Sequence, residues 1–292
     1  MTKDELFSRR NHVYRRTPER RLHREREALS FINEVGFCFL FSAEGSEAPT
    51  LFEAILGEPS DWTGQHDRET GLVWRWKDSL PVAKKCFYGK LLRAKPVLVS
   101  LDLFPYFYAV SGNYGDLDQY LQEYQDGKVS LAAKQIYEAL LYHGAMPTSH
   151  LRRQSNLAGK DNARAFERGL VELQVSLKIT KTGISEANRW HYCYVYDLLP
   201  RWLPDQVEQG LAIKSRDAYP VILRQYLRTV IVSTPDAILR LFGWPPETVE
   251  RAITTLVDAE DAAKGIAVQG LEGTWIGETE RRKGAHALDL PT

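Results

Sequence analysis

One pattern of apolar and charged residues occurs twice in this chain, with the same offset at every matching position (251 − 168 and 256 − 173, for example). The segments 166–173 (FERGLVEL) and 249–256 (VERAITTL) carry a Glu-Arg pair and apolar residues at matching positions. In each segment the apolar residues recur at the spacing of one helical face. A register shared in this way predicts one supersecondary unit that is used twice.

The residues around the first segment indicate what this unit is. A helix is predicted from a Ser130 N-cap to a terminating Gly144, a second helix starts at Thr148, and a third covers residues 162–174. The β-rich stretches 175–183 and 191–199 flank the polar turn SEANRW, which predicts a hairpin. Three helices followed by a hairpin is the element order of a winged helix.

The same order is predicted for residues 216–278 and, more loosely, for the N-terminal part of the chain. There we expect a long helix over 18–36, a third helix over 79–92, and a β-rich pair over 95–104 and 106–112. A Trp-rich insertion contains WRW (74–76), with two tryptophans at strand spacing. Such a pair could stack on nucleobases, but packing in the core is the favoured interpretation.

The predicted fold is therefore mainly α with β-hairpins (α+β), arranged as tandem winged-helix units. The predicted divisions are a basic N-terminal segment (1–17), a divergent winged-helix unit with the Trp-rich insertion (18–129), two further winged-helix units (130–215 and 216–278) and a polar tail (279–292).

Composition excludes several classes of protein. Lys+Arg and Asp+Glu both number 38, so net charge does not indicate a partner. The three scattered cysteines have no metal-ligand spacing, and no phosphate-binding loop or nucleophile elbow is present, so neither a metal nor a cofactor is expected. No apolar run approaches the ~20 residues that span a bilayer. We expect a cytoplasmic protein without a membrane partner.

The segment RAFERGLVELQVSLKITKTG…HYCYVYDLLPRWLP resembles the AlkZ/YcaQ family of winged-helix DNA glycosylases. It is similar to that family's recognition helix, its hairpin and its Tyr-Asp-Leu-Pro exit, here Tyr196, Asp197, Leu198 and Pro200, followed by Leu203 and Pro204. With the flanking units, the resemblance covers about residues 20 to 278. It implies a DNA partner, duplex or damaged, and N-glycosidic bond hydrolysis as the ancestral chemistry.

The sequence departs from that family at its catalytic triplet. The family carries Gln-apolar-Gln or Gln-apolar-Asp after the first long helix, and the matching positions here are Phe39, Leu40 and Phe41. None of these side chains can accept a proton or orient water, and hydrolysis of a glycosidic bond needs a group that can. We therefore assign no catalytic residue and expect no glycosylase activity of the family type.

Basic residues on the middle unit and near the N-terminus are the candidate DNA contacts, because Arg and Lys neutralise phosphates. Thr17 and Pro18 predict a helix start, and in such a helix Arg16, Arg20 and Arg24 would share one face. The alternative is that these cations pair with acidic residues of the chain itself. The candidates are Arg16, Arg20, Arg24, Arg152, Arg153, Lys160, Arg164, Arg168, Lys178, Lys181 and Arg189.

The sequence therefore predicts a DNA-binding protein without glycosylase activity. Two alternatives remain open. One is an active glycosylase or other DNA-repair enzyme that uses other residues, which a polar cleft with buried Asp, Glu, Gln or His between the first two units would favour. The other is a protein-interaction scaffold, with the partner bound by the third unit, whose third helix carries Glu247 and Glu250.

Overall fold

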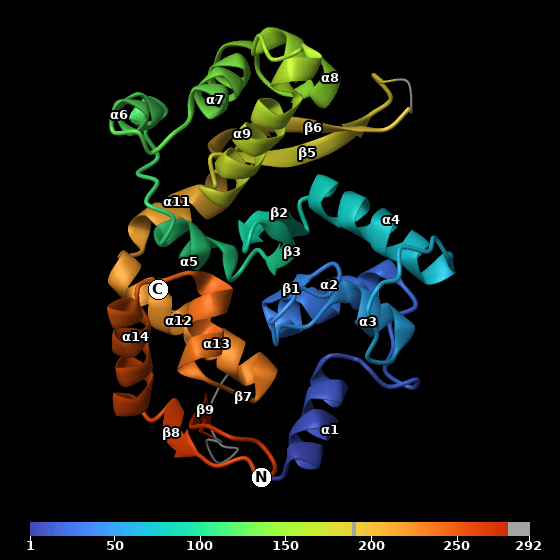
Figure 1. Cartoon of the computed structure of the whole chain (residues 1–292), viewed down its shortest axis with the longest axis vertical. Helices are drawn as coiled ribbons and strands as arrows, with labels where there is room; N and C mark the ends of the chain where they lie inside the picture. Colours follow the sequence, from blue (N-terminus) through green and yellow to red (C-terminus); the bar gives the residue numbers. More distant parts are fainter. Residues whose placement is uncertain (189–190, 280–292) are drawn as a thin grey trace.

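The computed structural model describes residues 1–188 and 191–279. Within them, the element order helix, short strand, helix, helix, β-hairpin occurs three times, as Figure 1 shows. The first unit comprises α2 (Glu25–Val35), β1 (Phe37–Phe39), α3 (Leu51–Leu56), α4 (Arg68–Val82), β2 (Cys86–Leu92) and β3 (Lys95–Ser100).

The second and third units repeat this order. The second comprises α7 (Leu131–His143), β4 (Met146–Pro147), α8 (Thr148–Gln154), the 3-10 turn η1 (Lys160–Asn162), α9 (Ala163–Val175), β5 (Ile179–Ser185) and β6 (Cys193–Leu198). The third comprises α12 (Ser215–Val230), β7 (Val232–Ser233), α13 (Pro235–Phe242), α14 (Pro246–Asp258), β8 (Ala262–Ile266) and β9 (Trp275–Glu278). The prediction of a mainly α fold with β-hairpins is confirmed.

All three sheets have the same topology. The second hairpin strand lies in the middle, the short strand pairs on one side of it and the first hairpin strand on the other, giving the orders β1-β3-β2, β4-β6-β5 and β7-β9-β8. Every pairing between these strands is antiparallel. The first hairpin strands β2, β5 and β8 are therefore sheet edges, with hydrogen-bonding groups free to meet another element.

Backbone landmarks repeat with the units. Helix α14 starts at the same offset from α9 as strand β8 does from β5 (246 − 163 and 262 − 179). The third helix of each unit is followed by a residue with positive φ, namely Lys84, Leu177 and Glu260. At each of these ends the next amide donates back into the last turn, as Lys178 does to the Leu173 carbonyl (2.9 Å). This is the helix-terminating geometry in which a left-handed residue satisfies the last free carbonyls.

The N-terminal part of the chain differs from the predictions. The helix expected over 18–36 begins only at Glu25, where Glu27 accepts from the amides of His23 and Arg24. The helix expected over 79–92 is wrong: Asp67 caps α4, which ends at Val82, and the following residues form strand β2. Pairing with β3 and packing against α4 outweigh the local helical preference of this stretch.

Trp74 and Trp76 lie on α4, and the burial of Trp76 agrees with the favoured interpretation of packing in the core. One further prediction for this part is wrong. The β-rich pair expected over 95–104 and 106–112 is the strand β3 followed by helix α5 (Phe104–Ala109), with Pro105 in its first turn. Helix α1 (Lys3–Val13), which the sequence did not indicate, carries a complete capping box between Thr2 and Glu5.

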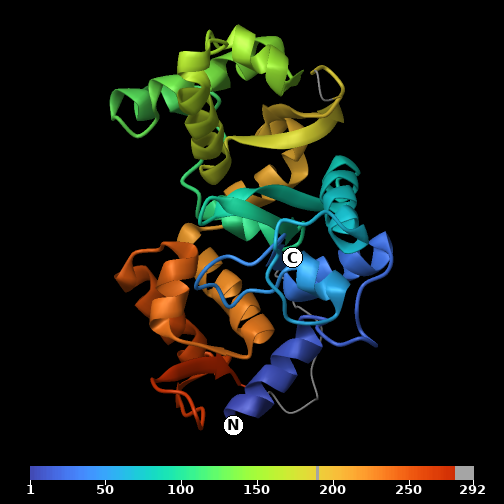
Figure 2. The same ribbon diagram turned by 45° about the vertical axis from the view of Figure 1, so that its right-hand side comes forward.

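The first and third units share one core. Phe37 of β1 stacks on Tyr226 of α12 at 6.3 Å between ring centroids, and the apolar residues of both units form one buried cluster. Helix α1 lies beside the hairpin of the third unit and below the first unit in the view of Figure 2. The Arg10 guanidinium donates to the carbonyls of Val230 (2.9 Å) and Val232 (2.7 Å) and forms an ion pair with Glu47 (2.8 Å).

The second unit has its own core and meets the first along their edge strands. Helix α9 packs against β2 and α4 packs against β5, so each third helix contacts the first hairpin strand of the other unit. The Thr180 hydroxyl donates to the Tyr88 carbonyl across this seam (3.2 Å). Connections between units are made by α5, α6 (Gln119–Gln125), α10 (Leu199–Trp202) and α11 (Pro204–Ala212).

Two observations bear on the excluded classes of protein. No helix in the described part of the chain is long and apolar enough to cross a membrane. Cys38, Cys86 and Cys193 are all buried with free thiols.

Candidate nucleic-acid interface

Three cations follow one another along α9 at intervals of four residues. Lys160 lies in the turn η1, and Arg164 and Arg168 lie on α9; we call these three the α9 stripe. All are exposed, as is Arg153 at the end of α8, and none forms an ion pair among the described residues. Arg164 lies in the first turn of α9, where no side chain caps the helix. A cation near the positive end of a helix dipole is unfavourable, and a bound anion would relieve this.

The equivalent positions in the other units do not reproduce the α9 stripe. In the third unit, at the offset that relates α14 to α9, they are Gly243, Glu247 and Arg251. In the first unit, at the offset between the ends of α4 and α9 (175 − 82), they are Asp67, Gly71 and Arg75. Among the three units, only the middle one therefore has a run of three cations leading into and along its third helix.

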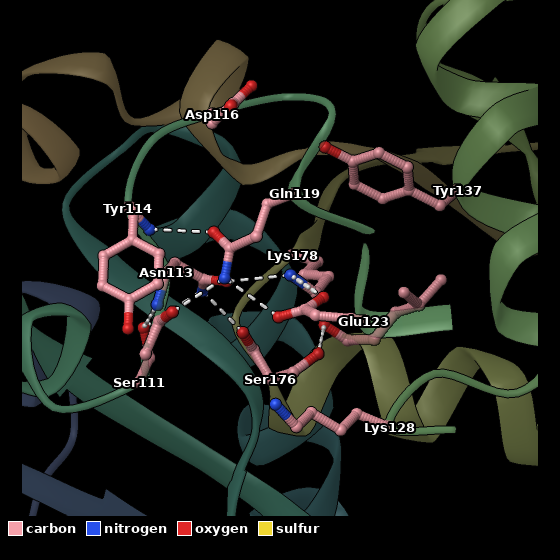
Figure 3. Close-up of polar contacts among 12 residues, drawn as sticks. Ser111, Asn113, Tyr114, Asp116, Gln119, Glu123, Lys128, Tyr137, Ser176 and Lys178 are labelled. Carbon is pink, nitrogen blue, oxygen red and sulfur yellow. Dashed lines mark hydrogen bonds and ion pairs between the residues drawn. The ribbon is translucent and has the colours of Figure 1, made fainter. Parts of the chain in front are cut away.

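Arg152 and Lys178 both form ion pairs within the protein. The Arg152 guanidinium pairs with Glu167 (2.6 Å) and lies over the Phe166 ring (4.4 Å to its centroid). Figure 3 shows Lys178 buried between Glu123 (2.7 Å) and the Asn113 side-chain oxygen (3.0 Å). Asn113 also donates to the Ser176 carbonyl (2.6 Å), so this network fastens the segment between the first two units to the end of α9.

The N-terminal arginines do not share a helical face, because residues 17–24 form no helix. Arg16 pairs with the buried Glu53 (2.5 Å) and lies over the Tyr14 ring (4.6 Å). Arg20 contacts the His12 imidazole, and Arg24 is exposed just before α2. Arg16 therefore pairs with an acidic residue of the chain itself, which is the alternative interpretation given above. Arg189 lies outside the described residues.

The positions that match the family's catalytic triplet lie in apolar surroundings. Phe39 and Leu40 are each 1% exposed. Phe41 is half-buried and stacks on Trp62 at 4.5 Å between ring centroids, with Phe52 and Trp74 as further ring neighbours. The Trp-rich insertion thus covers the chain just after β1 with aromatic side chains.

A buried polar cluster lies at the seam between the first two units, and most of it could not be foreseen from the sequence. It consists of Lys77 and Asp78 of α4, Tyr88 of β2, Lys181 of β5, Tyr192 next to β6 and Tyr194 of β6; we call it the seam cluster. The alternation of tyrosines over residues 192–196 is the signal that could have indicated one aromatic face of a strand.

Lys77 is the centre of the seam cluster. It is 1% exposed, and its ammonium pairs with Asp78 (2.5 Å) and donates to the hydroxyls of Tyr192 (2.8 Å) and Tyr194 (2.7 Å). The Tyr192 hydroxyl donates to the other Asp78 oxygen (2.9 Å). Carboxylate, ammonium and phenols therefore satisfy one another's hydrogen-bonding groups.

Lys181 lies on the other side of Tyr194 in different surroundings. Its amine is 3.7 Å from the centroid of the Tyr194 ring, 4.4 Å from that of Tyr88 and 3.3 Å from the Tyr88 hydroxyl. Burial, and after it the positive charge of Lys77, lower the pKa of Lys181 to about 7. Lys178 and Lys181, both candidate DNA contacts, are buried.

The fold defines a protein of tandem helix-and-hairpin units with a cationic third helix in the middle unit. A family model described as AlkZ related matches residues 22–243, and the chain therefore belongs to the AlkZ-related family. Among solved structures, the DNA glycosylase AlkZ of Streptomyces sahachiroi has a similar fold, with a TM-score of 0.59 and 12% sequence identity over 96% of this chain and 70% of that one. No curated protein matches the sequence.

Proposed function

We propose that this chain is a DNA-binding protein of the winged-helix type and that its middle unit makes the main contact with DNA. In this proposal α9 is the recognition helix and the β5–β6 hairpin is the wing. Membership in the AlkZ-related family and a fold similar to that of a DNA glycosylase support a DNA partner. The proposed contacts narrow to the exposed cations Arg153, Lys160, Arg164 and Arg168, with the exposed Arg24 as an outlying one.

The observation that carries the proposal is the α9 stripe. Three cations at four-residue spacing, without a carboxylate partner among the described residues, repel one another and favour a bound polyanion. The equivalent helix of the third unit has Glu247 and Glu250, so the same fold does not require this charge pattern. A requirement for binding phosphates explains why only the middle unit carries it.

Hydrolysis by the family's triplet is not part of this proposal. Phe39 and Leu40 are buried, and Phe41 is stacked on Trp62, so these positions offer no group that could activate water. A second candidate function, a nucleic-acid enzyme that uses other residues, is favoured by one observation. The seam cluster lies between the first two units and contains a carboxylate, two lysines and three tyrosines.

The test is duplex affinity measured against salt. The double variant Arg164→Gln/Arg168→Gln should weaken binding of a short fluorescent duplex. It should also flatten the slope of log affinity against log salt by up to about 1.8, at about 0.9 for each phosphate contact. Arg251→Gln is the matched control, because Arg251 occupies the equivalent position of the third unit and its guanidinium donates to its own helix at Glu247 and Thr248.

The control variant should bind with the affinity and salt slope of the wild type. Equal effects of the α9 and the Arg251 substitutions would contradict a specific role of the middle unit. Absence of salt-sensitive binding to any duplex, intact or damaged, would overturn the proposal and favour the scaffold alternative.

A further inference from the structure

The two lysines of the seam cluster have unlike surroundings. Lys77 has a carboxylate and two phenol hydroxyls as partners. Lys181 makes one long hydrogen bond, to the Tyr88 hydroxyl at 3.3 Å, and has no carboxylate within ion-pair distance among the described residues. Both side chains are buried, at 1% and 8% exposure. The fold thus pairs one lysine with a counter-ion and leaves the other without one.

This asymmetry favours the neutral form of Lys181. Lys77 has Asp78 as its counter-ion and donates to two phenol hydroxyls. A second ammonium on the other side of Tyr194 would be disfavoured by burial and by repulsion from Lys77, with Lys90 adding to it and Asp78 and Glu167 opposing it. The faces of Tyr88 and Tyr194 favour a cation, but the pKa of Lys181 is still lowered to about 7. Near neutral pH, much of Lys181 therefore carries a free lone pair.

We propose that Lys181 is a nucleophilic lysine that forms an imine with an aldehyde carried by nucleic acid. A lysine that is desolvated and next to another cation is activated for attack on carbonyls in this way. The substrate class rests on the proposed function. DNA carries an aldehyde where a base has been lost, because the sugar of an abasic site can open its ring. Lys77 is a positioning residue, because its positive charge favours the neutral amine of Lys181.

The reaction needs no oxidant, reductant or further reactant. The Lys181 amine attacks the carbonyl carbon, a C–N bond forms, and a proton passes from nitrogen to the carbonyl oxygen. The carbinolamine then loses water as the C=N bond forms. The Tyr88 hydroxyl, 3.3 Å from the amine, is the group placed to relay the proton. Tyr192, which is 42% exposed and bonded to Asp78, is the part of the cluster that reaches solvent.

The experiment is reductive trapping on the full chain. Wild-type protein is incubated near neutral pH with a duplex that contains one abasic site, sodium cyanoborohydride is added, and the covalent adduct is quantified on a denaturing gel and located by peptide mass spectrometry. We expect the adduct on Lys181. Lys181→Gln and Lys181→Arg should each lower its yield at least about tenfold, because neither supplies a neutral amine. Lys77→Met should shift the optimum of trapping to higher pH.

The fold supplies a matched control lysine. Lys264 is the counterpart of Lys181 on strand β8 of the third unit, is exposed and pairs with Glu250 (2.6 Å). Lys264→Gln should leave the adduct yield unchanged. Circular dichroism and salt-sensitive duplex binding of every variant show that it is folded and functional.

The outcomes separate this proposal from the proposed function. Wild-type protein that binds the abasic duplex but gives no adduct overturns the imine and leaves DNA binding intact. An adduct that survives in Lys181→Gln at the wild-type yield assigns the chemistry to another amine and also overturns it. If the duplex is not bound at all, the proposed function fails. Trapping with propionaldehyde then tests Lys181 by itself, and absence of modification there overturns its nucleophilic role.

Discussion

Tyr88 and Lys181 occupy equivalent positions in the first and second units and face each other across the seam. The offset between them (181 − 88) equals the offset between the ends of α4 and α9 (175 − 82). The Lys181 amine lies 4.4 Å from the centroid of the Tyr88 ring. The same strand position therefore carries an aromatic ring in the first unit and an amine in the second, and these two groups are in contact.

The lowered pKa of Lys181 predicts how stability depends on pH. Between about pH 7 and pH 10.5 the unfolded chain binds a proton at Lys181 that the folded chain does not, so the free energy of unfolding should rise with pH over this range. Lys181→Met should raise the free energy of unfolding at pH 7 and reduce its increase between pH 7 and 9. Urea denaturation at both pH values measures this. An increase with pH that is the same in both proteins would contradict the assignment.

The ion pair between Arg10 and Glu47 should contribute strongly to stability, because their side chains are 11% and 19% exposed. Arg10→Met would leave Glu47 without its cation and the carbonyls of Val230 and Val232 without a donor. We expect a loss of roughly 2–4 kcal/mol in the free energy of unfolding. Lys128→Gln, which breaks an exposed pair with Asp126, should change it by less than about 1 kcal/mol. Similar losses in both variants would contradict this ranking.

Two glycines that follow the first helices of their units should differ in their tolerance of a side chain. Gly36 and Gly144 both have positive φ (77° and 78°), so alanine strains the backbone at either position. At Gly36 a Cβ would also lie 2.5 Å from Gln225 Cγ, whereas at Gly144 nothing lies within 4 Å. Gly144→Ala should cost about 1 kcal/mol, and Gly36→Ala should cost at least about 1 kcal/mol more. Thermal unfolding of the two variants tests this, and equal costs would contradict the close approach of α12.

Lys178 should matter for stability and not for DNA affinity. Lys178→Gln removes the ion pair with Glu123 in the network of Figure 3, and we expect a loss of about 1–3 kcal/mol in the free energy of unfolding. The salt slope of duplex binding should stay that of the wild type, in contrast to the α9 variants. A flattened slope would show that Lys178 reaches a phosphate and that the network opens on binding.

The second and third units could be predicted from the sequence because their signals are local. Ser130 and Thr234 cap their helices, and the constant offset between the two units places the third helices and the hairpins. The first unit could not be predicted as well, because the local sequence of β2 favours a helix and only its pairing with β3 makes it a strand. The candidate sites could not be predicted either, because the residues that form each of them lie far apart in the sequence. Lys77 and Tyr194 are bonded although they lie on different units, and the engagement of Lys178 depends on Asn113 and Glu123.

The contact of α1 with the third unit has a consequence for how the chain is made. The Lys3 amide donates to the Gln269 carbonyl (2.9 Å), so a residue near the start of the chain is bonded to the loop of the last hairpin. During synthesis, α1 leaves the ribosome long before its partner segment around Gln269. The buried Leu6 lacks part of its core until then, because Val268 and Trp275 belong to this later hairpin segment. Docking of α1 onto the third unit therefore comes late in folding and carries a high entropic cost of loop closure.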